Sequence, residues 1–137
     1  MHNDKSILLV EDDRVDAMTV RRAFSDLKVT NKLVAVGNGE EALVFLQNGN
    51  NDKPCLILLD INMPKMNGIE FLKIAKNDHG IKSIPVVILT TSQEERDRME
   101  GFSNGVAGYM IKPVDYLQFV ETMRTIQMYW TLSEIPD

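Results

Sequence analysis

Short apolar runs alternate along the chain with longer segments in which apolar and polar residues are mixed. Apolar runs of this kind are typical of strands buried on both faces of a parallel sheet. Five segments are predicted strands: Ile7–Val10, Lys32–Val36, Cys55–Leu59, Val86–Leu89 and Gly108–Ile111. Each is followed by a segment with helical features, so strands and helices are expected to alternate from one end of the chain to the other.

The helical segments are recognised by their spacing and their starts. In the first, the residues expected on one face are Ala17, Val20, Phe24 and Leu27. Helix starts carry a polar cap with an acid or amide three residues later, a pattern that satisfies the free N–H groups of a first turn. The five such pairs are Asp13/Asp16, Asn38/Glu41, Asn67/Glu70, Ser92/Glu95 and Asp115/Gln118.

Five strand–helix units predict an α/β fold with a doubly wound, five-stranded parallel sheet and five helices. The smaller common version of this architecture is flavodoxin-like and has strand order 2-1-3-4-5. The length fits a single domain over residues 1–137, with a core at about 5–127 and a C-terminal extension at 128–137.

Composition narrows the class of protein. The chain is 44% hydrophobic and 26% charged, as in soluble globular proteins, and no apolar run approaches the roughly 18 residues of a membrane span. A net charge of −5 without a basic stripe argues against direct binding of nucleic acid or an anionic membrane. The N-terminal segment lacks the layout of a secretory signal, so a cytoplasmic protein is expected. Cys55 lies in an apolar run and is interpreted as a core thiol.

Carboxylates follow two of the predicted strands. Asp60 comes directly after Cys55–Leu59, and Glu11, Asp12 and Asp13 come directly after Ile7–Val10. With order 2-1-3-4-5 these strands are neighbours, so Glu11, Asp12 and Asp60 should meet at the carboxyl edge of the sheet, where such folds bind ligands. Crowded carboxylates repel one another, and a divalent cation with oxygen ligands relieves the repulsion.

A hydroxyl and an ammonium group are expected at the same edge, because Thr90 and Lys112 follow the fourth and fifth strands. A nucleophilic carboxylate, a divalent metal, a cation and a hydroxyl donor together suit the transfer of a phosphoryl group. Singly, each residue could equally be a helix cap, a loop residue or a solvated side chain.

From Lys5 to Arg124 the sequence resembles the receiver domains of two-component response regulators. The resemblance implies that Asp60 is the phosphoacceptor and that Asp12 contacts Mg²⁺ directly while Glu11 acts through a water. It also implies that the Asn62 carbonyl is a further Mg²⁺ ligand. Glu11, where Asp is more common, and Asn67 before Gly68 are mild departures from the family's pattern.

The resemblance also assigns a role to three further positions of the chain. Thr90 corresponds to the hydroxyl residue that binds the phosphoryl group, and Lys112-Pro113 to the family's lysine with its cis-proline. Tyr109 corresponds to the aromatic switch residue that turns inward on activation. Among receivers the chain is most similar to standalone ones paired with phytochrome-type or hybrid histidine kinases. A sensor histidine kinase and a downstream protein are the partners implied.

These features predict a phosphorylation-dependent signalling switch and not an enzyme. One alternative is an aspartate-nucleophile phosphatase or phosphotransferase acting on small substrates, but Asn62 stands where the dehalogenase-type phosphatases need a second acid. Another is a pseudo-receiver that only binds partners. The glycines around Asn38 fit a dinucleotide fingerprint formally, yet Glu40 and Glu41 would repel a pyrophosphate, which favours a helix cap.

The C-terminal residues raise a separate hypothesis. The last helix should pack on the sheet through Leu117, Val120, Met123 and Ile126. Apolar residues then remain at the end of the chain, namely Met128, Tyr129, Trp130, Leu132 and Ile135. They either fold back on their own chain or join two chains in a homodimer, as aromatic residues and methionine often do at interfaces.

Overall fold

The computed structural model describes residues 5–60, 66, 68–90, 108–111 and 116–132, with the backbone alone at 90, 108–111 and 129–132. The described strands form one parallel sheet with the order β2-β1-β3-β4-β5, which is the order predicted from the sequence. The strands are β1 (Ile7–Val10), β2 (Leu33–Val36), β3 (Leu56–Asp60), β4 (Val86–Thr90) and β5 (Gly108–Ile111). Predicted and observed strand boundaries differ by one residue at most.

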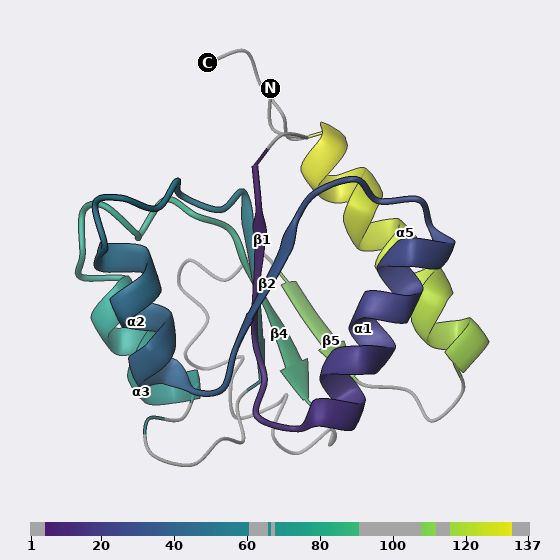
Figure 1. The fold of residues 1–137 in the computed structure, drawn as a ribbon, viewed down its shortest axis with the longest axis horizontal. Helices are drawn as coiled ribbons and strands as arrows, with labels where there is room; N and C mark the ends of the chain where they lie inside the picture. Colours follow the sequence, from purple (N-terminus) through teal and green to yellow (C-terminus); the bar gives the residue numbers. More distant parts are fainter. Residues whose placement is uncertain (1–4, 61–65, 67, 91–107, 112–115, 133–137) are drawn as a thin grey trace.

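Helices cover both faces of the sheet, so the fold is a three-layer α/β/α sandwich of the flavodoxin-like type (Figure 1). The described helices are α1 (Arg14–Asp26), α2 (Gly39–Gln47), α3 (Gly68–Ala75) and α5 (Tyr116–Leu132). Figure 1 shows α2 and α3 on one side of the sheet and α1 and α5 on the other. The helix predicted between β4 and β5, with its cap at Ser92, lies outside the described residues.

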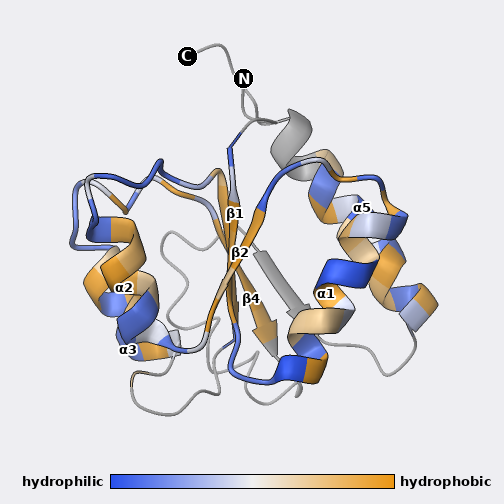
Figure 2. Ribbon diagram, viewed as in Figure 1, coloured by the Kyte–Doolittle hydropathy of each residue, from blue (hydrophilic) through white to orange (hydrophobic). Residues whose placement is uncertain are grey.

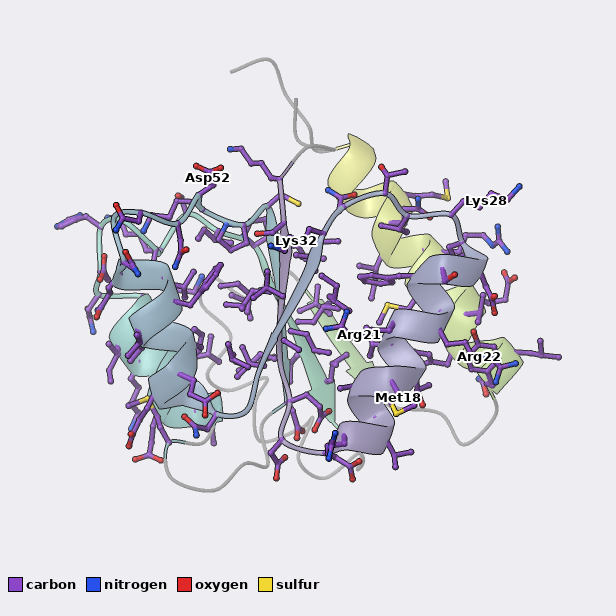
Figure 3. The ribbon with its side chains drawn as sticks, viewed as in Figure 1. Met18, Arg21, Arg22, Lys28, Lys32 and Asp52 are labelled. Carbon is purple, nitrogen blue, oxygen red and sulfur yellow. The ribbon has the colours of Figure 1, made fainter. Side chains whose placement is uncertain are left out.

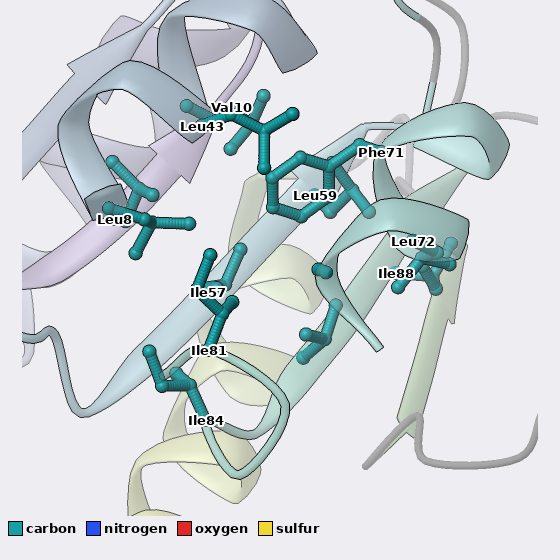
Figure 4. Packing of buried hydrophobic residues seen from close by; sticks show 14 residues of the cluster. Leu8, Val10, Leu43, Ile57, Leu59, Phe71, Leu72, Ile81, Ile84 and Ile88 are labelled. Carbon is teal, nitrogen blue, oxygen red and sulfur yellow. The ribbon is translucent and has the colours of Figure 1, made fainter. Parts of the chain in front are cut away.

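The two cores follow from the alternation of side chains along each strand, because successive residues point to opposite faces. Leu8, Ile57 and Ile88 pack under α2 and α3 (Figure 4). Their neighbours Leu9, Leu58 and Leu89 pack under α1 and α5. The central strands are therefore apolar throughout, as Figure 2 shows for β1 and β4.

Two of the predicted caps are confirmed. Asp13 caps α1, and its Oδ1 accepts hydrogen bonds from the N–H groups of Val15 and Asp16 at 2.8 and 3.1 Å. Asn38 caps α2 and accepts from the N–H of Glu41 at 3.0 Å. The caps predicted at Asn67 and Asp115 lie outside the described residues.

The sequence interpretation of α5 was wrong at two points. The helix continues to Leu132, beyond the predicted start of an extension at residue 128. Leu117 was expected to face the sheet, but it is 72% exposed. The buried face is set instead by Phe119 and Met123, and Leu117 lies about 200° around the helix from Phe119. The prediction of Met123 in the core is confirmed, and Val120 and Ile126 pack partly buried beside it.

Within the described residues, none of the helices combines the length and the hydrophobicity that a bilayer crossing requires.

Candidate phosphoryl and metal site

Strand register places Glu11 next to Asp60 at the carboxyl edge of the sheet. Val10 of β1 pairs with Leu59 of β3, so the next residue of each chain, Glu11 and Asp60, continues the same register. The backbone of Glu11 is fixed on its other side by a hydrogen bond from its N–H to the carbonyl of Val36, at 3.0 Å. Both carboxylates are therefore carried by backbone that hydrogen bonds of the sheet hold in place.

Three carboxylates converge there, as the sequence predicted. Carboxylate oxygens of Glu11, Asp12 and Asp60 all lie within 4.8 Å of one another. Glu11 and Asp60 are each only 5% exposed, whereas Asp12 is exposed. Glu11 also accepts a hydrogen bond through Oε2 from the N–H of Asp13, at 3.2 Å. This bond ties Glu11 to Asp13, the residue that caps α1.

The donor set fits a divalent metal ion. Like charges at this separation repel strongly when two of the three are shielded from water. Hard cations such as Mg²⁺ and Ca²⁺ prefer carboxylate oxygens, and Mg²⁺ is usually held by only one or two carboxylates together with waters and phosphate oxygens. The exposed Asp12 leaves one side of the cluster open to such ligands. Glu11, Asp12 and Asp60 are thus the described residues that could hold the metal.

The neighbouring strand brings one more predicted site residue, Thr90, into register beside Asp60. Leu89 pairs with Asp60, so Thr90 follows one position beyond it on the strand next to β3. Thr90 in turn pairs with Ile111, the residue before Lys112. Tyr109 lies within β5, and only its backbone is described. Asn62 and Lys112, with Pro113, lie outside the described residues.

Two contacts near the site were missed by sequence reasoning. Gly39, the first residue of α2, hydrogen-bonds to Met66, which follows the segment after Asp60. A glycine at a helical position is a poor helix former, and that was the available signal.

The second missed contact joins α1 and α5. The Tyr116 hydroxyl donates to Asp26 Oδ2 at 2.6 Å, and the Arg22 guanidinium lies 4.1 Å from the centre of the Tyr116 ring. Nothing in the sequence pairs residues so far apart.

Comparison with known proteins gives one consistent family. The family model described as the response regulator receiver domain matches residues 7–124. The chain is 38% identical over 127 residues to the probable methanogenesis regulatory protein FilR2 of Methanothrix harundinacea, covering 90% of this chain and 82% of that protein. It is 35% identical over 130 residues to response regulator Rcp1 of Synechocystis, covering 92% and 88%.

Solved structures that resemble the chain are also response regulators. The phosphorylated cyanobacterial phytochrome response regulator RcpA superposes with a TM-score of 0.85 at 34% identity, covering 96% of this chain and 97% of that one. The Mn²⁺-bound form of Rcp1 superposes with a TM-score of 0.81 at 34% identity and the same coverage. The structural relatives therefore include a phytochrome response regulator, and the Rcp1 structure holds a divalent metal.

Proposed function

Since this chain belongs to the family of response regulator receiver domains, we propose that Asp60 is the residue that accepts the phosphoryl group. Receiver domains are phosphorylation-dependent signalling switches. The observation that carries the assignment to Asp60 is the convergence of Glu11, Asp12 and Asp60 at the carboxyl end of the central strands. Asp60 is the member of the trio that ends a strand buried along its whole length.

Receiver domains bind a divalent metal, and we assign Mg²⁺ to this cluster. Glu11, Asp12 and Asp60 would hold it, together with the carbonyl of Asn62. When bound, the ion neutralises the carboxylates and the charge of the incoming phosphoryl oxygens. Glu11 and Asp12 keep that position negative and so select a cation.

In the proposed step, an Asp60 carboxylate oxygen attacks the phosphorus of a histidine kinase's phosphohistidine. A phosphorus–oxygen bond forms, the phosphorus–nitrogen bond breaks and the imidazole leaves. Lys112 neutralises the remaining charge on the phosphoryl oxygens and Thr90 donates a hydrogen bond to one of them. Catalysis is mainly positioning and charge stabilisation, so the domain assists its own phosphorylation without being an enzyme on other substrates.

The switch is proposed to involve Thr90 and Tyr109. Thr90 lies one position beyond Leu89, which pairs with Asp60, and Ile88, two residues before Thr90, pairs with Tyr109. Movement of Thr90 toward the acylphosphate would make room for the Tyr109 ring, which changes the surface presented to a downstream protein.

The kinase is proposed to dock on α1, because that helix begins two residues after Glu11 and Asp12, which belong to the metal site. Val15 and Met18 are 70% and 67% exposed on it, and their separation of three residues places them on one face of the helix. Figure 3 shows Met18 on α1. The partner proposed from the sequence is a phytochrome-type or hybrid kinase, and the relative RcpA, a phytochrome response regulator, favours the first of these. Met18→Lys should slow phosphotransfer from the kinase and leave labelling by acetyl phosphate unchanged. Equal rates from the kinase would exclude Met18 from the docking surface.

Stoichiometric labelling tests the proposal. With Mg²⁺ and acetyl phosphate the chain should take up one phosphoryl group, labile to hydroxylamine, and Asp60→Asn should take up none. The matched control is Asp52→Asn, which removes the same charge from an exposed position remote from the site (Figure 3). Labelling that survives in Asp60→Asn would refute the assignment. Multiple turnover of a generic phosphomonoester would instead support the alternative, an aspartate-nucleophile phosphatase or phosphotransferase.

A further inference from the structure

Gly39 and Met66 are in close contact at the start of α2. The N–H of Gly39 donates a hydrogen bond to the carbonyl oxygen of Met66 at 3.1 Å. A Cβ at position 39 would lie 2.8 Å from Met66 Cγ and 3.0 Å from both its Sδ and its carbonyl oxygen. The backbone of Gly39 lies outside the left-handed region, so the requirement for glycine comes from the space that Met66 occupies.

The start of α2 is itself firmly held. Asn38 is only 6% exposed and accepts a hydrogen bond from the N–H of Glu41. Glu41 Oε1 in turn accepts from the N–H of Gly37 at 2.8 Å, which completes a reciprocal cap around Gly39. Met66 also packs against the core shared by α2 and α3. The contact therefore joins Met66 to a fixed point of the fold.

Met66 lies near the end of the segment that connects β3 to α3. The segment that leaves Asp60 reaches Met66 just before α3 begins at Gly68. Asp60 is fixed at one end of this segment by the sheet, and Gly39 fixes Met66 at the other. The segment includes Asn62, which the proposed function assigns to the metal. A displacement of about 1 Å in a group that positions a reaction can lower its rate by about a hundredfold.

We propose that Gly39 is a positioning residue for Mg²⁺ binding and phosphorylation, acting through its contact with Met66. This inference rests on the proposed function of Asp60. It separates Gly39 from an ordinary helix residue, because helix propensity alone predicts that alanine at this position stabilises the chain. The collision with Met66 predicts the opposite consequence at the site, namely weaker Mg²⁺ binding and slower labelling.

The test compares full-length Gly39→Ala with Gly49→Ala, since a Cβ at position 49 would meet nothing within 4 Å. The dissociation constant for Mg²⁺ alone is measured by calorimetry, and the labelling rate is measured with acetyl phosphate. Gly39→Ala should bind Mg²⁺ about tenfold more weakly, the range seen when groups that support metal ligands are altered. Gly49→Ala should behave as the wild type does.

A double variant tests whether the loss of Mg²⁺ affinity in Gly39→Ala arises from the collision with the Met66 side chain. Gly39→Ala with Met66→Ala removes the Cγ and Sδ atoms that a Cβ would strike, and only the carbonyl oxygen remains close. Mg²⁺ affinity should recover in part, which two independent effects would not produce. Wild-type Mg²⁺ affinity and labelling in Gly39→Ala would overturn the inference, even if its melting temperature falls, because the role would then be purely structural.

If Gly39→Ala fails to fold, hydrogen exchange in the wild-type chain tests whether Gly39 is coupled to the Mg²⁺ site. Mg²⁺ should slow exchange of the Gly39 amide more than that of the Glu41 amide, which Asn38 holds within the cap. Equal slowing of both would overturn the inference. Failure of the wild type to bind Mg²⁺ or to be labelled would contradict the proposed function and this inference with it. A labelled wild type beside an unaffected Gly39→Ala contradicts this inference alone.

Discussion

Glu11 and Asp60 lie on adjacent parallel strands with their carboxylates within 4.8 Å of each other, and each is only 5% exposed. Burial strengthens the repulsion between like charges, so a divalent cation that binds the cluster should stabilise the folded chain. The stability of the chain should therefore report directly on the occupancy of this site.

Mg²⁺ should stabilise the wild-type chain because it binds the folded cluster and not the unfolded one. The gain in unfolding free energy is about 1.4 kcal/mol when free Mg²⁺ is about ten times its dissociation constant. Asp12→Asn should lose most of this gain. Asp13→Asn is the control, since asparagine also caps helices and Asp13 lies outside the trio. Chemical denaturation with and without Mg²⁺ measures the effect, and an equal gain in Asp12→Asn would exclude Asp12 as a ligand.

Asp60→Asn should be more stable than the wild type in metal-free buffer. Asparagine keeps the shape of the side chain and removes one of the buried charges, which relieves the repulsion from Glu11. The advantage should shrink as Mg²⁺ is added, because only the wild type gains from the ion. Urea denaturation in a chelating buffer and then in Mg²⁺ gives both values. A less stable Asp60→Asn without metal would show that Asp60 is already neutralised by other groups.

Tyr116 should make the junction of α1 and α5 sensitive to alkaline pH. Burial raises the pKa of Tyr116 above the usual 10.0 of a tyrosine, and the hydrogen bond to Asp26 and the Asp26 charge raise it further, while Arg22 lowers it. The neutral phenol is thus favoured in the folded state, so its contribution is fully present below pH 10.0 and is lost as pH rises through the raised pKa. Tyr116→Phe should lose about 1 kcal/mol at neutral pH.

The check for Tyr116 is the difference in unfolding free energy between wild type and Tyr116→Phe as a function of pH. The difference should be constant at neutral pH and should fall under alkaline conditions. Comparing the two chains cancels the titration of the other tyrosines and the lysines. A difference that does not change with pH would contradict the role of the Tyr116 proton.

Lys28 should be replaceable by glycine with a gain in stability. It follows the last turn of α1 with a φ of 58°, in the left-handed region that side chains disfavour. The N–H of Val29 bonds to the carbonyl of Phe24 and that of Lys28 to Ser25, which is the pattern of a glycine-type helix end. Lys28→Gly should raise the unfolding free energy by about 0.5–1 kcal/mol. Lys28→Ala removes the same charge but keeps the Cβ, so a similar gain there would refute the conformational explanation.

The sequence predicted the sheet and the acidic cluster because both depend on local patterns with a simple spatial consequence. Buried parallel strands are continuous apolar runs, and the strand order then makes Val10 and Leu59 neighbours. Glu11 and Asp60 meet as soon as that order is known. Asp13 and Asn38 were equally predictable, since a cap bonds to its own helix two or three residues later.

Contacts between distant elements could not be predicted in the same way. The pairing of Tyr116 with Asp26 depends on how α1 and α5 pack together, and the contact of Gly39 with Met66 depends on how α2 sits against the start of α3. Leu117 was assigned to the wrong face of α5 because its spacing from Val120 suits an apolar stripe as well as that of Phe119 and Met123 does. The packing of Phe119 on the sheet decided the rotation of the helix.

The last prediction is that the chain self-associates through the outward face of α5. Leu117 and Met128 are 72% and 58% exposed and lie about three turns apart, so they share one side of the helix. Glu121 and Arg124 lie between them and hydrogen-bond to each other at 3.4 Å, and this alternation of apolar and charged groups suits a pairing of two like helices. A homodimer through α5 is therefore expected, and its strength should depend on phosphorylation of Asp60.

Sedimentation of the full chain, with and without acetyl phosphate and Mg²⁺, tests the homodimer. Leu117→Arg and Met128→Lys should each weaken association, because each places a charge on the apolar side of α5. Val44→Lys is the matched control, since Val44 is 70% exposed on α2, in the opposite helical layer. Equal weakening by Val44→Lys would point to nonspecific association. A full-length chain that stays monomeric in both states at high micromolar concentration would exclude the dimer and favour a C-terminal segment that covers its own chain.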